Sequence, residues 1–206
     1  GITLIAIVDY GWGNLYSLQS SLNFLTLDSV ITSDPEIIKS ADRIILPGVG
    51  AFGDAVKLLK QSGLFDLIKD EAKKGKYILG ICLGMQLLFD KSFEYGEHKG
   101  LELVKGEVCP LSDDIKGDLK IPHMGWNSLC IKDISDPIFK YTKKGDYVYF
   151  VHSFYAKNCE DSLLAYADYE VKVPALVKNK NVYGAQFHPE KSGDVGLNIL
   201  RGFCEA

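Results

Sequence analysis

The 206-residue sequence has no long apolar run and no concentration of basic residues. Its apolar runs are only as long as β-strands, well short of the roughly 20 residues that a transmembrane helix needs. No charged-then-apolar leader begins the chain. With 23 Lys and Arg against 27 Asp and Glu, the formal net charge is −4 and the isoelectric point is about 5.6. These features argue against a membrane protein and against a nucleic-acid-binding surface, so we expect neither kind of partner.

Paired cysteines are also missing. The five cysteines form an odd number without a Cys-x-x-Cys pair, so the sequence indicates neither a disulfide framework nor a zinc ribbon, and it is typical of a reducing cytoplasm. The four histidines are not spaced as metal ligands either. We therefore expect a cytoplasmic protein with no metal ion and no other cofactor. These cysteines and histidines are Cys82, Cys109, Cys130, Cys159, Cys204, His98, His123, His152 and His188.

What the first half of the sequence does contain is an alternation of strand-like and helix-like segments. Apolar runs suited to buried strands alternate with helical patterns. This alternation predicts an α/β fold with an open, mostly parallel sheet and helices on both faces. The predicted strands are 2–8, 29–32, 41–46 and 77–79, and the predicted helices are 14–27, 54–60, 64–74 and 86–91.

After about Gly100 the pattern changes to short strands separated by turn residues. We expect these segments to form an added antiparallel section, still within a single domain that spans residues 1–206. A hydrophobic content of 47% is enough for one sizeable core at this length. The predicted strands are 101–108, 128–131, 147–151, 163–167, 175–177 and 182–187, and a last helix is predicted at 195–203.

The stretch Gly80-Ile81-Cys82-Leu83-Gly84-Met85-Gln86 joins a predicted strand to a predicted helix. Its Gly-x-Cys-x-Gly spacing is the cysteine form of a nucleophile elbow, a turn too tight for side chains beside the nucleophile. At a helix N-terminus, the dipole and the free N–H groups favour thiolate over thiol. A buried structural cysteine is the alternative, but the two glycines favour a nucleophile at Cys82.

A glycine-rich loop, Pro47-Gly48-Val49-Gly50-Ala51-Phe52-Gly53, precedes the predicted helix 54–60. It matches Gly-x-Gly-x-x-Gly, so a dinucleotide site is formally possible. That fingerprint also needs an acidic residue at a strand end about 20 positions later, whereas Asp70 and Glu71 lie inside a predicted helix. The other use of such a loop is to present backbone N–H groups to an oxyanion beside a nucleophile.

Near the end of the sequence, Gln186-Phe187-His188-Pro189-Glu190-Lys191-Ser192 follows a predicted strand. A cysteine nucleophile needs a base that accepts its proton and later protonates the leaving group. It also needs a third group that orients the imidazole. His188 and Glu190 together could fill both roles. A histidine that merely caps a strand fits this stretch equally well by itself, but the elbow at Cys82 favours the catalytic interpretation.

The Pro-Gly-Val-Gly loop, the Cys82 elbow and His188-Pro189-Glu190 together resemble the class I, or triad, glutamine amidotransferases. The resemblance covers nearly the whole chain in the family's order. Two further stretches, Asp9-Tyr10-Gly11-Trp12-Gly13-Asn14-Leu15 and Pro122-His123-Met124-Gly125-Trp126-Asn127, resemble one branch, the glutaminase subunit of imidazole glycerol phosphate synthase. Glutaminases of anthranilate, GMP or pyridoxal phosphate synthesis share the triad but, as a rule, not these two stretches. One departure is Phe154, where tyrosine is common.

The resemblance implies that the chain hydrolyses glutamine to glutamate and ammonia through a thioester on Cys82. It implies that His188 relays the proton and that Glu190 orients His188. It also implies oxyanion donors beside the nucleophile and in the glycine-rich loop, and contacts to the amino-acid end of the substrate. The expected oxyanion residues are Leu83, Val49 and Gly50, and the expected substrate-binding residues are Gly48, Gln86, Glu94, Ser153 and Phe154.

The resemblance further implies a partner. In the family, ammonia passes to a cyclase subunit with a (β/α)8 barrel, so we expect a heterodimer in histidine biosynthesis. The matching interface positions are Asn14, Trp126, Tyr149 and Lys191. Two other functions stay open: a catalytically inactive amidotransferase-like binding module, and a cysteine hydrolase or peptidase that acts without a partner. Glutamine turnover separates the first from an enzyme, and a comparison of glutamine with peptide substrates separates the second.

Overall fold

The computed structural model describes residues 3–11 and 13–206. Ile2, which the first predicted strand included, lies outside this part of the chain, as do Gly1 and Trp12. The main sheet consists of β1 (Leu4–Val8), β2 (Asp28–Thr32), β3 (Arg43–Leu46), β4 (Tyr77–Ile81), β9 (Cys130–Ile131), β12 (Leu163–Tyr169), β13 (Val171–Asn179) and β14 (Val182–Ala185).

The strands of the main sheet follow the order β2-β1-β3-β4-β14-β13-β12-β9. The pairs from β2 to β14 are parallel, and the pairs from β14 to β9 are antiparallel. The predicted mostly parallel sheet with an antiparallel addition is therefore confirmed. Because β14 inserts beside β4, the segment that follows β14 ends next to the segment that follows β4. This placement brings the His188 stretch to the elbow.

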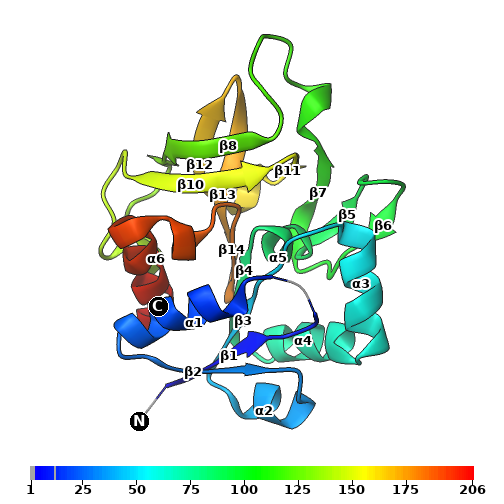
Figure 1. The fold of residues 1–206 in the computed structure, drawn as a ribbon, viewed down its shortest axis with the longest axis vertical. Coiled ribbons are helices and arrows are strands. Elements are labelled where there is room, and N and C mark those ends of the chain that lie inside the picture. Colours follow the sequence, from blue (N-terminus) through cyan, green and yellow to red (C-terminus); the bar gives the residue numbers. More distant parts are fainter. Residues whose placement is uncertain (1–2, 12) are drawn as a thin grey trace.

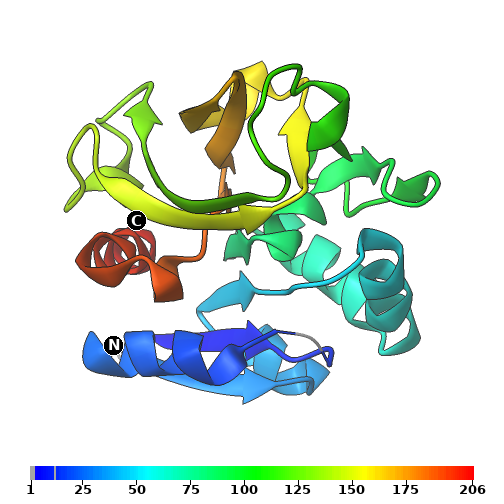
Figure 2. The same ribbon diagram turned by 45° about the horizontal axis from the view of Figure 1, so that its top comes forward.

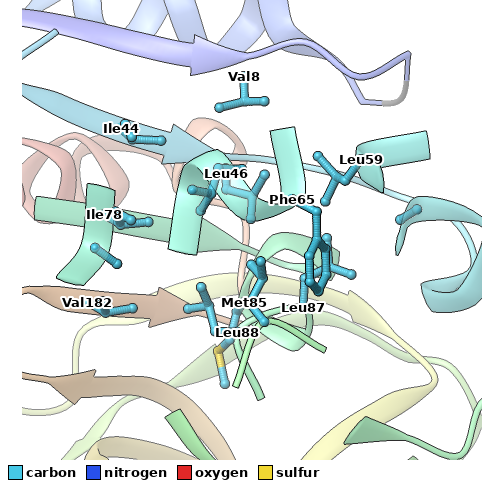
Figure 3. Packing of buried hydrophobic residues seen from close by; sticks show 14 of the residues in the cluster. Val8, Ile44, Leu46, Leu59, Phe65, Ile78, Met85, Leu87, Leu88 and Val182 are labelled. Carbon is cyan, nitrogen blue, oxygen red and sulfur yellow. The ribbon is translucent and has the colours of Figure 1, made fainter. Parts of the chain in front are cut away.

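Helices cover both faces of the parallel section, as predicted (Figures 1 and 2). One core cluster joins the sheet to the apolar sides of α1 and α6, and a second joins the other face to α2, α3 and α4. Figure 3 shows this second cluster, which includes Val8, Ile44, Ile78 and Val182 from neighbouring strands and Phe65 of α4. The helices are α1 (Leu15–Phe24), α2 (Pro35–Ser40), α3 (Phe52–Gln61), α4 (Leu64–Lys73) and α6 (Gly193–Glu205). In the described part of the chain, no helix is long and apolar enough to cross a membrane.

Two smaller sheets lie beside the main one. A two-stranded ribbon pairs β8 (His123–Ser128) with β10 (Tyr147–His152), and it lies over α6 in Figures 1 and 2. A four-stranded sheet has the order β11-β7-β5-β6. Its strands are β5 (Phe89–Ser92), β6 (His98–Lys99), β7 (Val104–Pro110) and β11 (Phe154–Lys157).

The predicted helix 86–91 is wrong. The helix after the elbow, α5 (Leu83–Gln86), has a single turn, and the chain then enters β5, where Phe89 pairs with Val104 of β7. Leu87, Leu88 and Phe89 are fully buried. A short apolar run that is buried on every side has no polar face to reveal its period, so its sequence fits a helix and a strand equally well.

Several other short elements also differ from the prediction. The predicted strand 128–131 is divided between β8 and β9, and no strand was predicted for β5, β6 or β11. Helix α2 was missed although its start is marked: Asp34 accepts a hydrogen bond from the Glu36 N–H, and Pro35 occupies the first helical turn. These residues are favoured at a helix N-cap and at the first helical position.

Candidate active site

Cys82 lies in a strained turn between β4 and α5, with φ 55° and ψ −113°. Its N–H donates to the Ala185 carbonyl at 2.7 Å, which anchors the turn to β14. The flanking glycines are required by close packing. A Cβ atom at Gly80 would lie 2.5 Å from the Gly84 carbonyl oxygen, and one at Gly84 would lie 1.7 Å from the Leu46 carbonyl oxygen. A non-glycine residue at positive φ, held this tightly, is typical of a functional turn.

We expect Gly84→Ala to destabilise the protein by about 3 kcal/mol, because the added methyl group meets backbone atoms that cannot rotate away. Urea unfolding followed by circular dichroism measures this change. Gly117→Ala is the matched control, since its Cβ would lie 3.4 Å from a carboxylate oxygen of Glu170, an ordinary contact. Equal unfolding midpoints for the two variants would contradict the packing argument.

The elbow opens into a cavity of about 370 Å³. Cys82 and His188 line it together, although they lie more than 100 positions apart in the sequence. Most of the predicted oxyanion and substrate-binding residues line it too, and Gly48 does not. The full lining is Val49, Gly50, Cys82, Leu83, Gln86, Glu94, Tyr95, Val151, His152, Ser153, Phe154, His188 and Lys191.

His188 is oriented by Glu190, its neighbour across the 3-10 turn η4 (Pro189–Lys191). His188 Nδ1 lies 2.7 Å from Glu190 Oε1, and both side chains are buried. Because the carboxylate accepts, Nδ1 carries hydrogen and Nε2 is left to exchange a proton at the cavity. Ser192 fixes the backbone: its hydroxyl donates to the His188 carbonyl at 2.6 Å and accepts from the Tyr149 N–H at 2.9 Å.

The electrostatics favour a charged His188. Burial by itself lowers its pKa, but interactions with Cys82 and Glu190 outweigh burial and raise the pKa of His188 to about 10. An imidazolium beside a cysteine is the usual means of holding that cysteine as thiolate. By contrast, burial raises the pKa of Cys159 and of Cys204 to about 12, so these thiols stay protonated.

Cys82 is the N-cap of α5, so it lies at a helix N-terminus as predicted, but this helix is short. Helix α5 has four residues, so few peptide dipoles add up along its axis. Its first N–H, that of Leu83, donates to the Gly48 carbonyl at 3.3 Å. Leu83 was the expected oxyanion donor, and in this conformation its donor is already occupied. An interaction with Cys82 is among the causes that raise the pKa of His188, so the imidazolium is a positive charge beside the sulfur.

The glycine-rich loop is held at its base by Tyr10, whose hydroxyl donates to the Pro47 carbonyl at 2.8 Å. Gly48 packs against this tyrosine so closely that a Cβ atom would lie 2.0 Å from its hydroxyl oxygen. Gly50 has φ 107°, a conformation that glycine adopts at little cost. Gly48 also lines a small cavity with Asn14, His188 and Glu190.

Two side-chain amides connect the wall of the main cavity to the sulfur. Gln86 Nε2 donates to the Phe154 carbonyl at 3.1 Å and to Gln186 Oε1 at 3.1 Å. Gln186 Nε2 in turn donates to Cys82 Sγ at 3.7 Å. On the other side, Glu94 is buried, and this burial is the main cause that raises the pKa of its carboxyl.

Three of the four predicted interface residues lie close to His188, and the Tyr149 carbonyl accepts a hydrogen bond from the His188 N–H at 3.0 Å. Lys191 lines the main cavity, and Asn14 lines the small one. Trp126 and Tyr149 pair across the β8–β10 ribbon, with ring centroids 5.9 Å apart, and Trp126 is 56% exposed.

Residues that sequence reasoning left unassigned also belong to the site: Gln186, Tyr10, Ser192 and His152. A signal existed for Gln186, because side chains two positions apart on an extended segment share a face, and Gln186 precedes His188 by two. Tyr10 and Ser192 act through contacts with distant loops, which no local pattern reveals.

The dinucleotide interpretation of the glycine-rich loop has no support in the structure. Asp70 and Glu71 both lie in α4, and Glu71 pairs with Lys76 at 3.3 Å. Neither carboxylate is at a strand end, where it would hold a ribose. Across residues 3–11 and 13–206, no group of three or more His, Cys, Asp or Glu side chains is arranged to hold a metal ion.

Comparison with known proteins agrees with this geometry. A family model described as glutamine amidotransferase class-I matches residues 6–205. The chain is 51% identical to the imidazole glycerol phosphate synthase subunit HisH of Caldanaerobacter subterraneus subsp. tengcongensis, over 98% of both chains. It is 50% identical to the HisH subunit of Bacillus subtilis, over 98% of this chain and 96% of the relative.

Solved structures show the same fold at lower sequence identity. PurLQS from Thermotoga maritima superposes with a TM-score of 0.76 at 20% identity, over 100% of this chain and 99% of that one. A crystal structure of a glutamine amidotransferase gives a TM-score of 0.75 at 19% identity, over 97% of both chains. The chain therefore belongs to the class I glutamine amidotransferase family and, within it, to the family of the HisH subunits of imidazole glycerol phosphate synthase.

Proposed function

We propose that this chain is the glutaminase subunit of an imidazole glycerol phosphate synthase of the cytoplasm, with Cys82, His188 and Glu190 as its catalytic triad. The observation that supports it most is the single cavity shared by Cys82 and His188, with Glu190 2.7 Å behind the imidazole. The relatives that share half of its residues carry the name of that subunit.

In the proposed reaction, Cys82 Sγ attacks the side-chain carboxamide carbon of glutamine, and the carbonyl oxygen becomes an oxyanion. His188 Nε2 donates its proton to the amide nitrogen, the C–N bond breaks, and ammonia leaves a glutamyl thioester behind. A water molecule then attacks the thioester while His188 accepts its proton. The C–S bond breaks, glutamate leaves, and the thiolate–imidazolium pair is restored.

The proposed partner is a cyclase subunit with a (β/α)8 barrel, which receives the ammonia. The outward side chains of the β8–β10 ribbon support a docking role, because Met124, Trp126 and Tyr147 are each more than half exposed. Aromatic residues and methionine are enriched in protein interfaces. Lys191, Asn14 and Tyr149 are the proposed interface residues that also lie against the triad or its backbone.

We further propose that the structure represents a resting state of the oxyanion loop, because the Gly48 carbonyl occupies the Leu83 N–H. Catalysis needs this donor, and a second one from Val49 or Gly50, near the developing oxyanion. One missing donor costs about 100- to 1000-fold in rate. A peptide flip between Gly48 and Gly50 would free Leu83, and a partner can favour the flipped state only through contacts that differ between the two states.

We therefore expect glutamine turnover at saturating glutamine to rise by about 100- to 1000-fold when the cyclase subunit and its nucleotide ligand are added. Ammonia release is measured for the chain alone, with the cyclase subunit, and with both the subunit and the nucleotide. Equal turnover in all three would contradict the gated loop. No turnover in any of them would contradict the proposed function itself.

A further inference from the structure

The proposed mechanism does not use two buried histidines, His123 on β8 and His152 on β10. Their rings are hydrogen-bonded to each other. The strand register pairs them directly, and His123 Nδ1 lies 2.8 Å from His152 Nε2. His152 Nδ1 lies 2.9 Å from the carbonyl oxygen of Phe154, at the wall of the main cavity. The His123 ring also stacks on the rings of Phe150 and Tyr169, with centroids 4.6 and 4.1 Å away.

The partners of these two rings fix where each proton is. A carbonyl oxygen can only accept, so His152 Nδ1 donates to Phe154, and His152 Nε2 is left as an acceptor. His123 Nδ1 must then donate to it, which leaves His123 Nε2 as an acceptor. Asn127 supplies that hydrogen from Nδ2 at 3.3 Å, and the same amide donates to the Asp168 carbonyl at 2.9 Å. Each hydrogen bond thus has one possible direction while both rings are neutral.

At its other end, this series of hydrogen bonds reaches the nucleophile Cys82. The Phe154 carbonyl accepts from His152 and also from Gln86 Nε2. The other hydrogen of that amide goes to Gln186, which donates to Cys82 Sγ. A continuous path of hydrogen bonds therefore leads from Asn127 on the ribbon to the sulfur.

We propose that His123 and His152, as neutral imidazoles in the Nδ1–H form, are positioning residues that hold the Ser153–Phe154 backbone in place for glutamine. The proposal rests on the function proposed above, since it assigns this backbone to the substrate. Buried polar networks in which every member is satisfied fix a single geometry, and a partly satisfied one does not. Loss of one imidazole would leave a nitrogen of the other ring without its hydrogen-bond partner. That ring, and then the carbonyl of Phe154, would be free to reorient.

The surroundings keep both rings uncharged. Burial lowers the pKa of His123 to about 4. Burial is also the main cause that lowers the pKa of His152 to about 3. The positive charges of His123 and His188 add to this effect, and the Phe154 carbonyl opposes it. The titratable groups near the pair are His188, whose charge acts on His152, Cys82, which lines the main cavity together with His152, and Tyr169 of β12, which stacks on His123. Protonation of either ring would set two N–H groups against each other. The series of hydrogen bonds therefore persists as the pH falls, until about pH 4.

Nitrogen NMR of the protein labelled with 15N-histidine tests the proton positions without any substitution. We expect both His123 and His152 to appear as neutral Nδ1–H tautomers, unchanged between about pH 8 and about pH 5. An unperturbed histidine would titrate near 6.5 in that range. An Nε2–H tautomer at His152, or a titration of either ring near neutral pH, would overturn the proposal.

Kinetics test the consequence. His123→Phe keeps a ring for stacking but leaves His152 Nε2 unpaired. We expect it to raise the KM for glutamine about tenfold and to change kcat less than about threefold, in the complex with the cyclase subunit. Tyr169→Phe is the matched control, because it keeps the stacking ring on His123 and lies outside the chain of hydrogen bonds. An unchanged KM in His123→Phe, or an equal rise in Tyr169→Phe, would contradict the proposal.

A rescue experiment separates positioning from simple packing. In His152→Asn, the amide Nδ2 takes the place of Nδ1 and can still donate to the Phe154 carbonyl, whereas His152→Leu removes the donor. We expect His152→Asn to keep a KM several-fold below that of His152→Leu; equal KM values would overturn the proposal. Absence of glutamine turnover in the unaltered complex would instead contradict the proposed function, and the NMR result would still decide the tautomers.

Discussion

Cys82→Ala is expected to abolish glutamine hydrolysis while the fold stays intact. Among the described residues, Cys82 is the one cysteine that lines the main cavity; it shares this cavity with His188, and its sulfur accepts a hydrogen bond from Gln186. In a serine protease, the nucleophile acts as a unit with its base, and removal of the nucleophile lowers kcat by a factor on the order of 10⁶. We expect a comparable loss here, because none of the other described residues that line the cavity has a thiol that could form the thioester.

The measurement is ammonia release by the variant in complex with the cyclase subunit, together with its thermal unfolding. Cys109→Ala is the matched control: it removes a partly buried thiol from β7, outside the cavity lining. Burial, supported by the charge of Glu107, raises the pKa of the Cys109 thiol, so this group stays protonated. Near-normal ammonia release by Cys82→Ala, or an equal loss in Cys109→Ala, would show that the nucleophile is misassigned.

The parts of this molecule that could be predicted from its sequence are those that local chemistry determines. The apolar runs of the parallel strands, the glycines around Cys82 and the Pro-Glu pair after His188 each carry their own signal. Glycine is needed at Gly84 because the Leu46 carbonyl lies where a Cβ would be, and the Gly-x-Cys-x-Gly spacing expresses that need directly. The order of the strands then brings His188 to Cys82.

The parts that could not be predicted depend on contacts between distant segments. The run after Gln86 is a strand because β7 pairs with it, a fact that its own apolar residues do not encode. The bond from Gln186 to Cys82 spans 104 positions, and the pairing of His123 with His152 depends on the register of a ribbon. The direction in which the Gly48 carbonyl points depends on the conformation of the loop. Glycine tolerates either orientation of the peptide, so the sequence does not determine it.

The second large effect is expected at Glu190, whose replacement by glutamine should lower kcat by up to about 10⁴ and change the KM for glutamine little. A serine-protease triad loses about that much when its aspartate becomes asparagine. Glutamine has nearly the same shape, and its carbonyl oxygen can still accept the hydrogen of His188 Nδ1 across the present 2.7 Å. The change therefore removes a negative charge and keeps the geometry, so the effect reports how far that charge stabilises the imidazolium.

The pH dependence of kcat/KM should also change in Glu190→Gln, and the direction of that change can be predicted. Because Glu190 helps to raise the pKa of His188 to about 10, the unaltered enzyme holds its imidazolium through neutral pH and loses it as pH rises through about 10. We expect the alkaline limb of kcat/KM to fall near that value and to move to lower pH in Glu190→Gln, since the uncharged amide no longer favours the proton. Glu36→Gln makes the same chemical change at an exposed site on α2 and should leave the alkaline limb of kcat/KM in place. An unmoved alkaline limb together with an undiminished kcat would mean that a group other than Glu190 holds the charge of His188.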